Sequence, residues 1–243
     1  MSIAPENMSV NAGIIIASLP DAAISLQSQG DVVSSLLLAQ LSARFKFPLG
    51  SQYAERENAY ESVLNDLSWT TLHQSHSEQP AAQTLDVVNV LMNESARLFE
   101  FRIGVAFSNL ASNLQLSAPT EQARKVWREH VVRRVEPVQE STPDCSAIEE
   151  SVVCIKLALI DSDLRLHTLM LRFSTRAVLT EDFLNQSVLT APDTSVDVQG
   201  DTYSLNESVY SHLRDTINDK LIHKRRDLVM PWSVSPSTAV PVE

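Results

Sequence analysis

The chain has 243 residues, of which 20% are charged and 44% hydrophobic, values typical of a globular protein that can bury a sizeable core. Its net charge of −11 disfavours nucleic acid and anionic membranes as general partners. It contains only five glycines, which argues against a glycine-rich phosphate-binding loop.

Cysteine use and the distribution of apolar residues bear on the cellular compartment. Cys145 and Cys154 are the only cysteines and form no C-x-x-C motif, so a reducing compartment is expected. Residues 1–43 contain no Lys or Arg, so the apolar run 13–19 lacks the positive flank of a secretory signal. No apolar run approaches the roughly 18 residues of a membrane span. We therefore expect a cytoplasmic protein, and export without a signal remains open.

The first part of the chain predicts mainly helices. Residues 11–19 fit either a short strand or a buried turn of helix. Asp31 can cap a helix that continues, with apolar residues three or four positions apart, to the Pro-Leu-Gly break at 48–50. A second helix is expected over residues 51–67, and the polar stretch 70–82 is interpreted as a linker.

The middle of the chain contains two ambiguous segments. A third helix is expected to begin at or beside Thr84. Residues 98–114 alternate as a strand would, but they also carry a helical stripe whose length favours a helix, because strands average about five or six residues. Residues 121–139 fit either a helix followed by a strand or two short strands. Residues 140–150 are interpreted as a polar loop.

The strongest pattern in the sequence is an apolar β-hairpin. Residues 152–160 and 164–174 both alternate, and residues 161–163, Asp-Ser-Asp, supply turn chemistry between them. Short edge strands are expected at 177–179 and 195–203.

An amphipathic helix is predicted after these strands. Ser204 and Glu207 fit a capping box at its start. Its apolar stripe, which we expect to pack on the apolar face of the hairpin, consists of Tyr210, Leu213, Ile217 and Leu221. Residues 233–243 are expected to form a disordered tail.

These elements predict an α+β fold. Helices over about 31–115 precede an antiparallel sheet of four or five strands, on which the C-terminal helix packs (sheet and helix about 124–228). We expect a single domain over residues 1–232.

Few residue patterns suggest chemistry. The pair His73 and His76 has a spacing that a metal site could use, but it lies in the expected linker without acidic or Cys ligands nearby, so no metal and no cofactor is predicted. Asp161 and Asp163 are interpreted as turn formers, and Cys154 as an inert thiol within a strand. No G-x-S-x-G elbow is present, so no catalytic residue is assigned.

Two basic clusters stand out in an acidic chain. One is formed by Lys224, Arg225 and Arg226. The other cluster lies between residues 124 and 134. It could dock an acidic protein partner, although solvated or internally paired charges are the simpler interpretation. Its tryptophan favours an interface, because Trp and Arg are frequent at binding hot spots. The candidate partner surface comprises Arg124, Lys125, Trp127, Arg128, Arg133 and Arg134.

The chain resembles a family of uncharacterised bacterial proteins. The similarity is spread over about residues 60–224 and departs from the family pattern over residues 94–136. The matching pieces lie at 60–69, 84–88, 152–157, 173–174, 205–210, 214 and 219–221. Some members of that family look like accessory proteins encoded beside tripartite α-helical pore-forming toxins. The resemblance implies an accessory role and carries over no site residue, because the matching positions are structural.

The sequence thus favours a non-enzymatic accessory or protein-interaction protein, and the resemblance suggests a toxin component as its partner. One alternative is a membrane-active toxin component, although membrane binding is disfavoured. A weaker alternative is a small-molecule-binding or hydrolytic domain, which a pocket lined by His130, His167 or paired carboxylates would support. The oligomeric state is not predicted.

Overall fold

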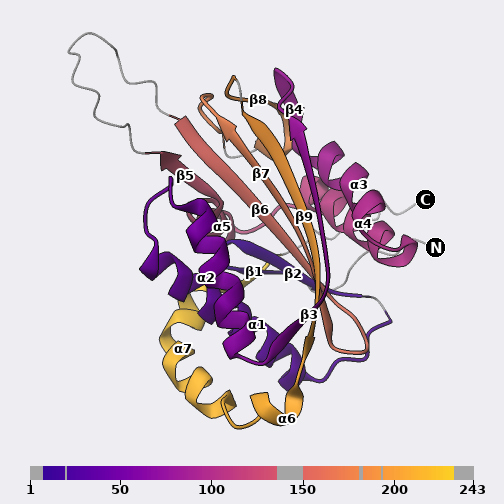
Figure 1. The fold of residues 1–243 in the computed structure, drawn as a ribbon, viewed down its shortest axis with the longest axis vertical. Coiled ribbons are helices and arrows are strands. Elements are labelled where there is room, and N and C mark those ends of the chain that lie inside the picture. Colours follow the sequence, from indigo (N-terminus) through magenta and orange to yellow (C-terminus); the bar gives the residue numbers. More distant parts are fainter. Residues whose placement is uncertain (1–7, 20, 136–149, 181–182, 193, 233–243) are drawn as a thin grey trace, which may run out of the picture.

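The computed structural model describes residues 8–19, 21–135, 150–180, 183–192 and 194–232. Its centre is an eight-stranded mixed sheet in the order β10-β1-β2-β6-β7-β9-β3, with β5 also paired to β6 (Figure 1). Every pairing is antiparallel except that of β2 with β6. The strands are β1 (Ser9–Asn11), β2 (Ile14–Ser18), β3 (Trp69–Pro80), β5 (Val132–Val135), β6 (Glu150–Ile160), β7 (Arg165–Thr175), β9 (Ser195–Leu205) and β10 (Val229–Pro231).

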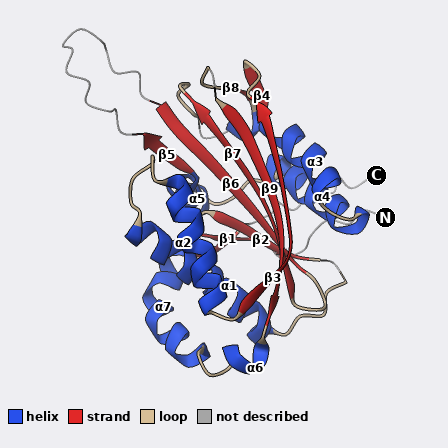
Figure 2. Ribbon diagram, in the orientation of Figure 1, coloured by secondary structure: helices blue, strands red, loops and turns tan. Residues whose placement is uncertain are grey.

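Helices cover both faces of this sheet, so the molecule has three layers (Figure 2). One face carries α1 (Leu26–Lys46), α2 (Tyr53–Asp66), α6 (Glu207–Tyr210) and α7 (Arg214–Leu228). The other carries α3 (Val87–Leu98), α4 (Phe101–Leu116), α5 (Glu121–Val131) and the 3-10 turn η1 (Phe183–Asn185). A separate two-stranded sheet pairs β4 (Thr84–Asp86) with β8 (Ser187–Leu189).

The predicted hairpin is confirmed as β6 and β7, which pair over ten residues of each strand. Asp161 forms the turn as expected, because its Oδ1 accepts hydrogen bonds from the backbone N–H groups of Asp163 and Arg165, both at 2.9 Å. Leu157 and Leu169 lie on the apolar face, which packs against α3, α4 and α5. The hairpin therefore organises one of the two cores.

The predicted antiparallel sheet of four or five strands is wrong in number and in direction. Residues 11–19, left open between strand and helix, supply the parallel strand β2. Residues 70–82 are not a linker: most of them form β3, an edge strand paired with β9. Their polar sequence misled the prediction because an edge strand exposes side chains that a central strand would bury. Residues 195–203 form β9 but lie between β7 and β3, and residues 177–179 form no strand.

The ambiguous helical segments are resolved by the structure. Residues 98–114 lie mostly in α4, as stripe length predicted, and residues 121–135 form α5 followed by β5. The first helix begins earlier than expected, with Ser25 as its cap, so Asp31 lies inside α1 and is buried. The expected disordered tail lies outside the described residues.

The C-terminal helix packs differently from the prediction. Ser204 belongs to β9, and the side chain of Asn206 caps α6 in place of the expected capping box. Ile217 and Leu221 of α7 pack in the core formed with α1, while the apolar face of the hairpin is covered by helices on the opposite side of the sheet. Among the described residues, no helix is both long and apolar enough to cross a membrane.

A buried ion pair fixes α7 to α1. Arg214 donates from Nε to Asp31 Oδ1 at 2.9 Å and from Nη2 to Oδ2 at 2.8 Å. The Asp31 side chain is 4% exposed and the Arg214 side chain 17%. Removing Asp31 takes away the close hydrogen bonds that hold Arg214 and leaves only Glu207, whose side chain is 49% exposed, as its acidic partner.

Replacing Asp31 with Ala is expected to lower the free energy of unfolding by about 3 kcal/mol, as measured by urea denaturation. The matched control is Asp21→Ala, because Asp21 pairs with Arg102 on the surface, where both side chains are more than half exposed. That control should cost less than about 1 kcal/mol. Equal losses for the two variants would contradict the clamping role of Asp31.

Candidate functional site

A pocket lies where β2 and β5 meet the same edge of β6. Val132 of β5 pairs with Val153, and Ile14 of β2 pairs with Lys156. Between these two ladders Cys154 lies in a stretch of β6 that neither strand reaches. Residues of α1, α2 and α5 close the gap into a cavity of about 70 Å³, room for more than one water molecule. It is lined by Gly13, Ile14, Gln40, Ala43, Arg44, Gly50, Tyr53, Arg56, Glu57, Tyr60, His130, Arg133, Val152, Cys154 and Lys156.

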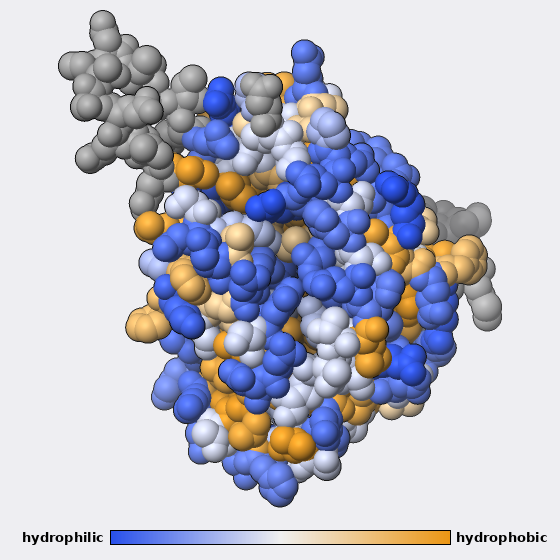
Figure 3. Space-filling model, viewed as in Figure 1, coloured by the Kyte–Doolittle hydropathy of each residue, from blue (hydrophilic) through white to orange (hydrophobic). Residues whose placement is uncertain are grey.

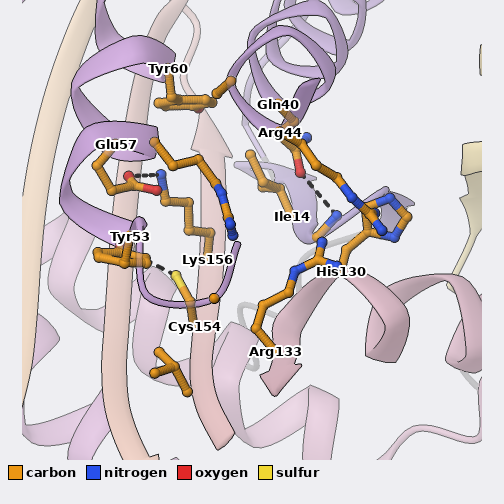
Figure 4. A pocket seen from close by; sticks show the side chains of 15 residues that line it. Ile14, Gln40, Arg44, Tyr53, Glu57, Tyr60, His130, Arg133, Cys154 and Lys156 are labelled. Atoms are coloured by element: carbon orange, nitrogen blue, oxygen red, sulfur yellow. Dashed lines mark hydrogen bonds and ion pairs between the residues drawn. The ribbon is translucent and has the colours of Figure 1, made fainter. Parts of the chain in front are cut away.

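Three arginines from separate elements line this pocket: Arg44 of α1, Arg56 of α2 and Arg133 of β5. Figure 4 shows Arg44 and Arg133 extending towards His130, with Tyr53, Glu57 and Lys156 on the other side of the cavity. We call the cavity the arginine pocket. Burial lowers the pKa of Arg133 to about 10, and repulsion from Arg44 and Arg56 adds to this effect. Burial, and then repulsion from Arg56, also lowers the pKa of Arg44.

The three guanidinium groups lack acidic partners. Among the described residues, no carboxylate forms an ion pair with Arg44, Arg56 or Arg133. Glu129 exerts only a weak opposing field on Arg44 and Arg133. The Nε atom of Arg133 is buried without a hydrogen-bond partner, a state that typically costs about 1–3 kcal/mol. Three guanidinium charges in one pocket without acidic partners among the described residues indicate a site that can bind an anion.

Arg56 is held in place by the backbone. Its Nε donates to the carbonyl oxygen of Phe47 at 3.0 Å and its Nη2 to that of Leu49 at 2.5 Å. These bonds fix the guanidinium plane before any ligand arrives, which lowers the entropy cost of binding.

The opposite wall of the arginine pocket is neutral overall. Lys156 forms an ion pair with Glu57, and its Nζ lies 3.9 Å from the centroid of the Tyr60 ring. Burial lowers the pKa of Lys156, but Glu57 together with Tyr60 and Cys154 more than offsets this, so the net pKa is raised. The positive charge of Lys156 is therefore already matched by Glu57.

Cys154 lines the pocket as a protonated thiol. Its Sγ lies 3.4 Å from Tyr53 Oη. Burial, followed by the field of Glu57, raises its pKa to about 11. The thiolate is the nucleophilic form, so the environment agrees with the interpretation of Cys154 as inert.

His130 connects the arginine pocket to α5. Its Nδ1 lies 2.8 Å from the carbonyl oxygen of Val126, so Nδ1 carries the proton in the neutral ring. Burial lowers the pKa of His130; the bond to Val126 opposes the shift, and the charges of Arg44 and Arg133 reinforce it. The imidazole therefore responds to any change of charge in the pocket.

The predicted basic surface is divided by the structure. Of its members only Arg133 lines the arginine pocket. Trp127 is 2% exposed and stacks on Phe183 with a centroid distance of 5.7 Å, so it belongs to the core and not to a surface. Arg128 donates to the carbonyl oxygen of Leu179. Arg124 is half-buried, and only Lys125 and Arg134 are exposed. A partner role for the exposed members stays a prediction.

The other residues noted in the sequence have structural environments. His73 lies on the edge strand β3, with its Nε2 2.6 Å from Ser75 Oγ. His167 is buried, with Nε2 3.3 Å from Asp161 Oδ2 and Nδ1 3.0 Å from Thr202 Oγ1. This chain of carboxylate, imidazole and hydroxyl ties the end of the hairpin to β9. Among the described residues, no three His, Cys, Asp or Glu side chains form a group that could hold a metal ion.

Sequence reasoning missed Arg44 and Arg56. It grouped basic residues by proximity in the chain, whereas the pocket collects them from segments almost 90 positions apart. The only available signal was that Arg44 lies in the last turn of a predicted helix, where a positive charge also suits the helix dipole.

The fold and site thus define a three-layer protein of the predicted α+β class with an arginine-lined pocket. No protein-family model and no curated protein match the chain. Three solved structures are similar in fold. Activated Cyt2Ba monomer from Bacillus thuringiensis subsp. israelensis is 11% identical with a TM-score of 0.46, over 80% of this chain and 97% of that one. A delta-endotoxin is 10% identical with a TM-score of 0.42, over 79% and 80% of the two chains. The Evf virulence factor is 11% identical with a TM-score of 0.37, over 88% and 85%.

These identities and TM-scores carry no argument about function. The resemblance to the family of toxin-associated bacterial proteins was made on sequence motifs, and it stays a prediction.

Replacing Arg133 with Met is expected to raise the free energy of unfolding by about 1 kcal/mol, because it removes a buried unpaired donor and a repelled charge. Urea denaturation measures the change. The exposed Lys125→Met variant should stay within about 0.5 kcal/mol of the native chain. A lower free energy of unfolding in Arg133→Met would contradict the inference that the buried guanidinium destabilises the native protein.

The same Arg133→Met variant is expected to raise the pKa of His130, since it removes one of the positive charges that lower it. An NMR titration of the imidazole signals measures the shift. His167 serves as the internal control, because burial lowers its pKa in an environment outside the arginine pocket. An equal shift of both histidines would indicate a general structural change.

Proposed function

We propose that this protein is a non-enzymatic interaction protein that binds an anionic group of its partner in the arginine pocket. One observation carries the proposal: Arg44, Arg56 and Arg133 converge from three elements, and no carboxylate among the described residues pairs with them. Guanidinium groups suit this role because they stay charged when partly buried and present several N–H donors in a planar fork.

Glu57 and Cys154 support binding over catalysis, whereas His130 in the lining meets the condition stated for the small-molecule-binding or hydrolytic alternative, which stays a prediction. Glu57, the only carboxylate in the lining among the described residues, is held by Lys156. The Cys154 thiol is protonated at neutral pH, because its pKa lies near 11. Neither group is poised to exchange a proton or attack a bound molecule near neutrality.

The face of the molecule drawn in Figure 3 also favours polar recognition. Figure 3 shows hydrophobic residues in small scattered groups over one face of the molecule, among predominantly hydrophilic ones. A partner that relied on a broad apolar contact would need a continuous patch on its docking surface. A charged anchor in a pocket needs no such patch. The resemblance to proteins encoded beside tripartite pore-forming toxins makes a toxin component the first partner to test.

Affinity capture from the native organism with the tagged full-length protein tests this proposal. We expect one or a few proteins, identified by mass spectrometry, to be recovered with the native chain and lost with the double variant Arg44→Met/Arg133→Met. The matched control is Arg165→Met/Lys220→Met, which removes two exposed positive charges outside the pocket and outside the candidate partner surface. Recovery that survives the pocket variant, or that disappears equally with the control, would contradict the proposal.

A further inference from the structure

We infer that the arginine pocket takes a phosphate monoester and discriminates against carboxylates. This inference rests on the proposed anion-binding function and names the chemical class of the ligand. It follows from the balance of charge in the pocket, the arrangement of its donors and the nature of its remaining walls.

The charge of the pocket matches a dianion. Among the described residues, its lining holds four positively charged side chains and one carboxylate, and Glu57 is already paired with Lys156. The charges of Arg44, Arg56 and Arg133 are left. A carboxylate brings one negative charge, whereas a phosphate monoester brings close to two at neutral pH. The dianion compensates more of the repulsion that these arginines exert on one another.

The donors approach from several directions. Arg44 comes from α1, Arg56 from the first turn of α2 and Arg133 from β5, and Figure 4 shows the side chains of Arg44 and Arg133 entering the pocket from separate elements. Two oxygens in one plane can satisfy one guanidinium fork in a bidentate manner. Three forks on different sides suit the three terminal oxygens of a phosphate monoester, which point away from one another.

Each arginine has N–H groups to spare. The backbone carbonyls of Phe47 and Leu49 occupy Nε and Nη2 of Arg56, which leaves its Nη1. Arg133 has a buried Nε without a hydrogen-bond partner, so the protein itself satisfies this guanidinium incompletely. A phosphate oxygen in the pocket would accept charge-assisted hydrogen bonds from its Nη groups.

The remaining lining suits the carbon side of an ester. Ile14, Ala43 and Val152 present apolar surface, and Gly13 and Gly50 keep the backbone close on two sides. A Cβ at Gly13 would lie 3.1 Å from His130 Cβ, and one at Gly50 would lie 2.4 Å from the carbonyl oxygen of Arg134. Larger residues at these two positions would therefore displace the walls that carry His130 and Arg133, and the apolar surface between them suits the first carbon atoms of an ester. The rest of the ligand would extend out of the opening.

Isothermal titration calorimetry on the full-length protein tests the inference with a matched pair of ligands, N-acetyl-phosphoserine amide and N-acetyl-glutamate amide, and with inorganic phosphate. We expect the two phosphates to bind at least tenfold more tightly than the glutamate derivative. Arg133→Met and Arg44→Met should each weaken phosphate binding at least about tenfold, the loss expected for one charge-assisted contact. Lys125→Met should leave it within about twofold. Phosphate should also raise the pKa of His130 in an NMR titration of the native chain.

Other outcomes separate this inference from the proposed function. Equal or tighter binding of the glutamate derivative, lost in Arg133→Met, would overturn the phosphate assignment and leave the anion-binding function in place. Binding to vesicles of phosphatidylglycerol without any response to the soluble phosphates would also overturn it, because a diester on a surface would then be the ligand. If no soluble anion and no vesicle binds, and affinity capture is insensitive to the pocket variant, both proposals fail.

Discussion

The parallel pairing of β2 with β6 is the constraint on which the rest of the structure depends. It places a five-residue strand from the start of the chain beside the central hairpin, and it buries Ile14, Ile15 and Ile16 on both faces of the sheet. Burying an aliphatic side chain of this size contributes roughly 1.5–3 kcal/mol, so this short strand contributes to both cores at once. β1 and β10 reach the sheet only through β2. Without this pairing the α1 and α7 layer would lose the part of the sheet nearest to it.

The same pairing creates the arginine pocket. Because β2 and β5 share one edge of β6 without meeting, they leave a gap that helices cover and no further strand fills. Charged side chains enter this gap from three directions. Most of the interior follows the usual rule that buried charge is paired, as Asp31 with Arg214 and Lys156 with Glu57. Arg133 departs from that rule, and such local departures from an otherwise consistent fold are typical of functional sites.

An element could be predicted from the sequence when the residues that determine its structure lie close together in the chain. The hairpin was predictable because its alternation and its turn at Asp161 are local. Helix α4 was predictable because its stripe is longer than a strand would be. Strand β2 was not, because five apolar residues fit either structure and only pairing with a strand about 140 residues later decides between them. Strand β3 was missed because it lies at the edge of the sheet. Its pairing with β9 makes it a strand, whereas its exposed side chains give no apolar pattern.

The candidate site was less accessible to prediction for the same reason. Arg133 was found because it lies in a run of basic residues, but its neighbours there, Lys125 and Trp127, lie on the surface and in the core respectively. The residues that join it in space, Arg44 and Arg56, belong to helices whose own patterns show nothing unusual. No signal in a single sequence shows which charges a fold will bring together without partners.

The position of β1 in the sheet has a consequence for the order of folding. β1 and β2 leave the ribosome first, yet β2 needs β6 as its neighbour and β1 needs β10, which is more than 200 residues away. Closing loops of this length before the contacts can form slows folding, and β2 can pair only with β1 until β6 has been synthesised. The β1–β2 pair is thus synthesised well before the strands that flank it in the sheet. The exposed Ile-Ile-Ile segment would be the stretch of the nascent chain that most needs protection against aggregation.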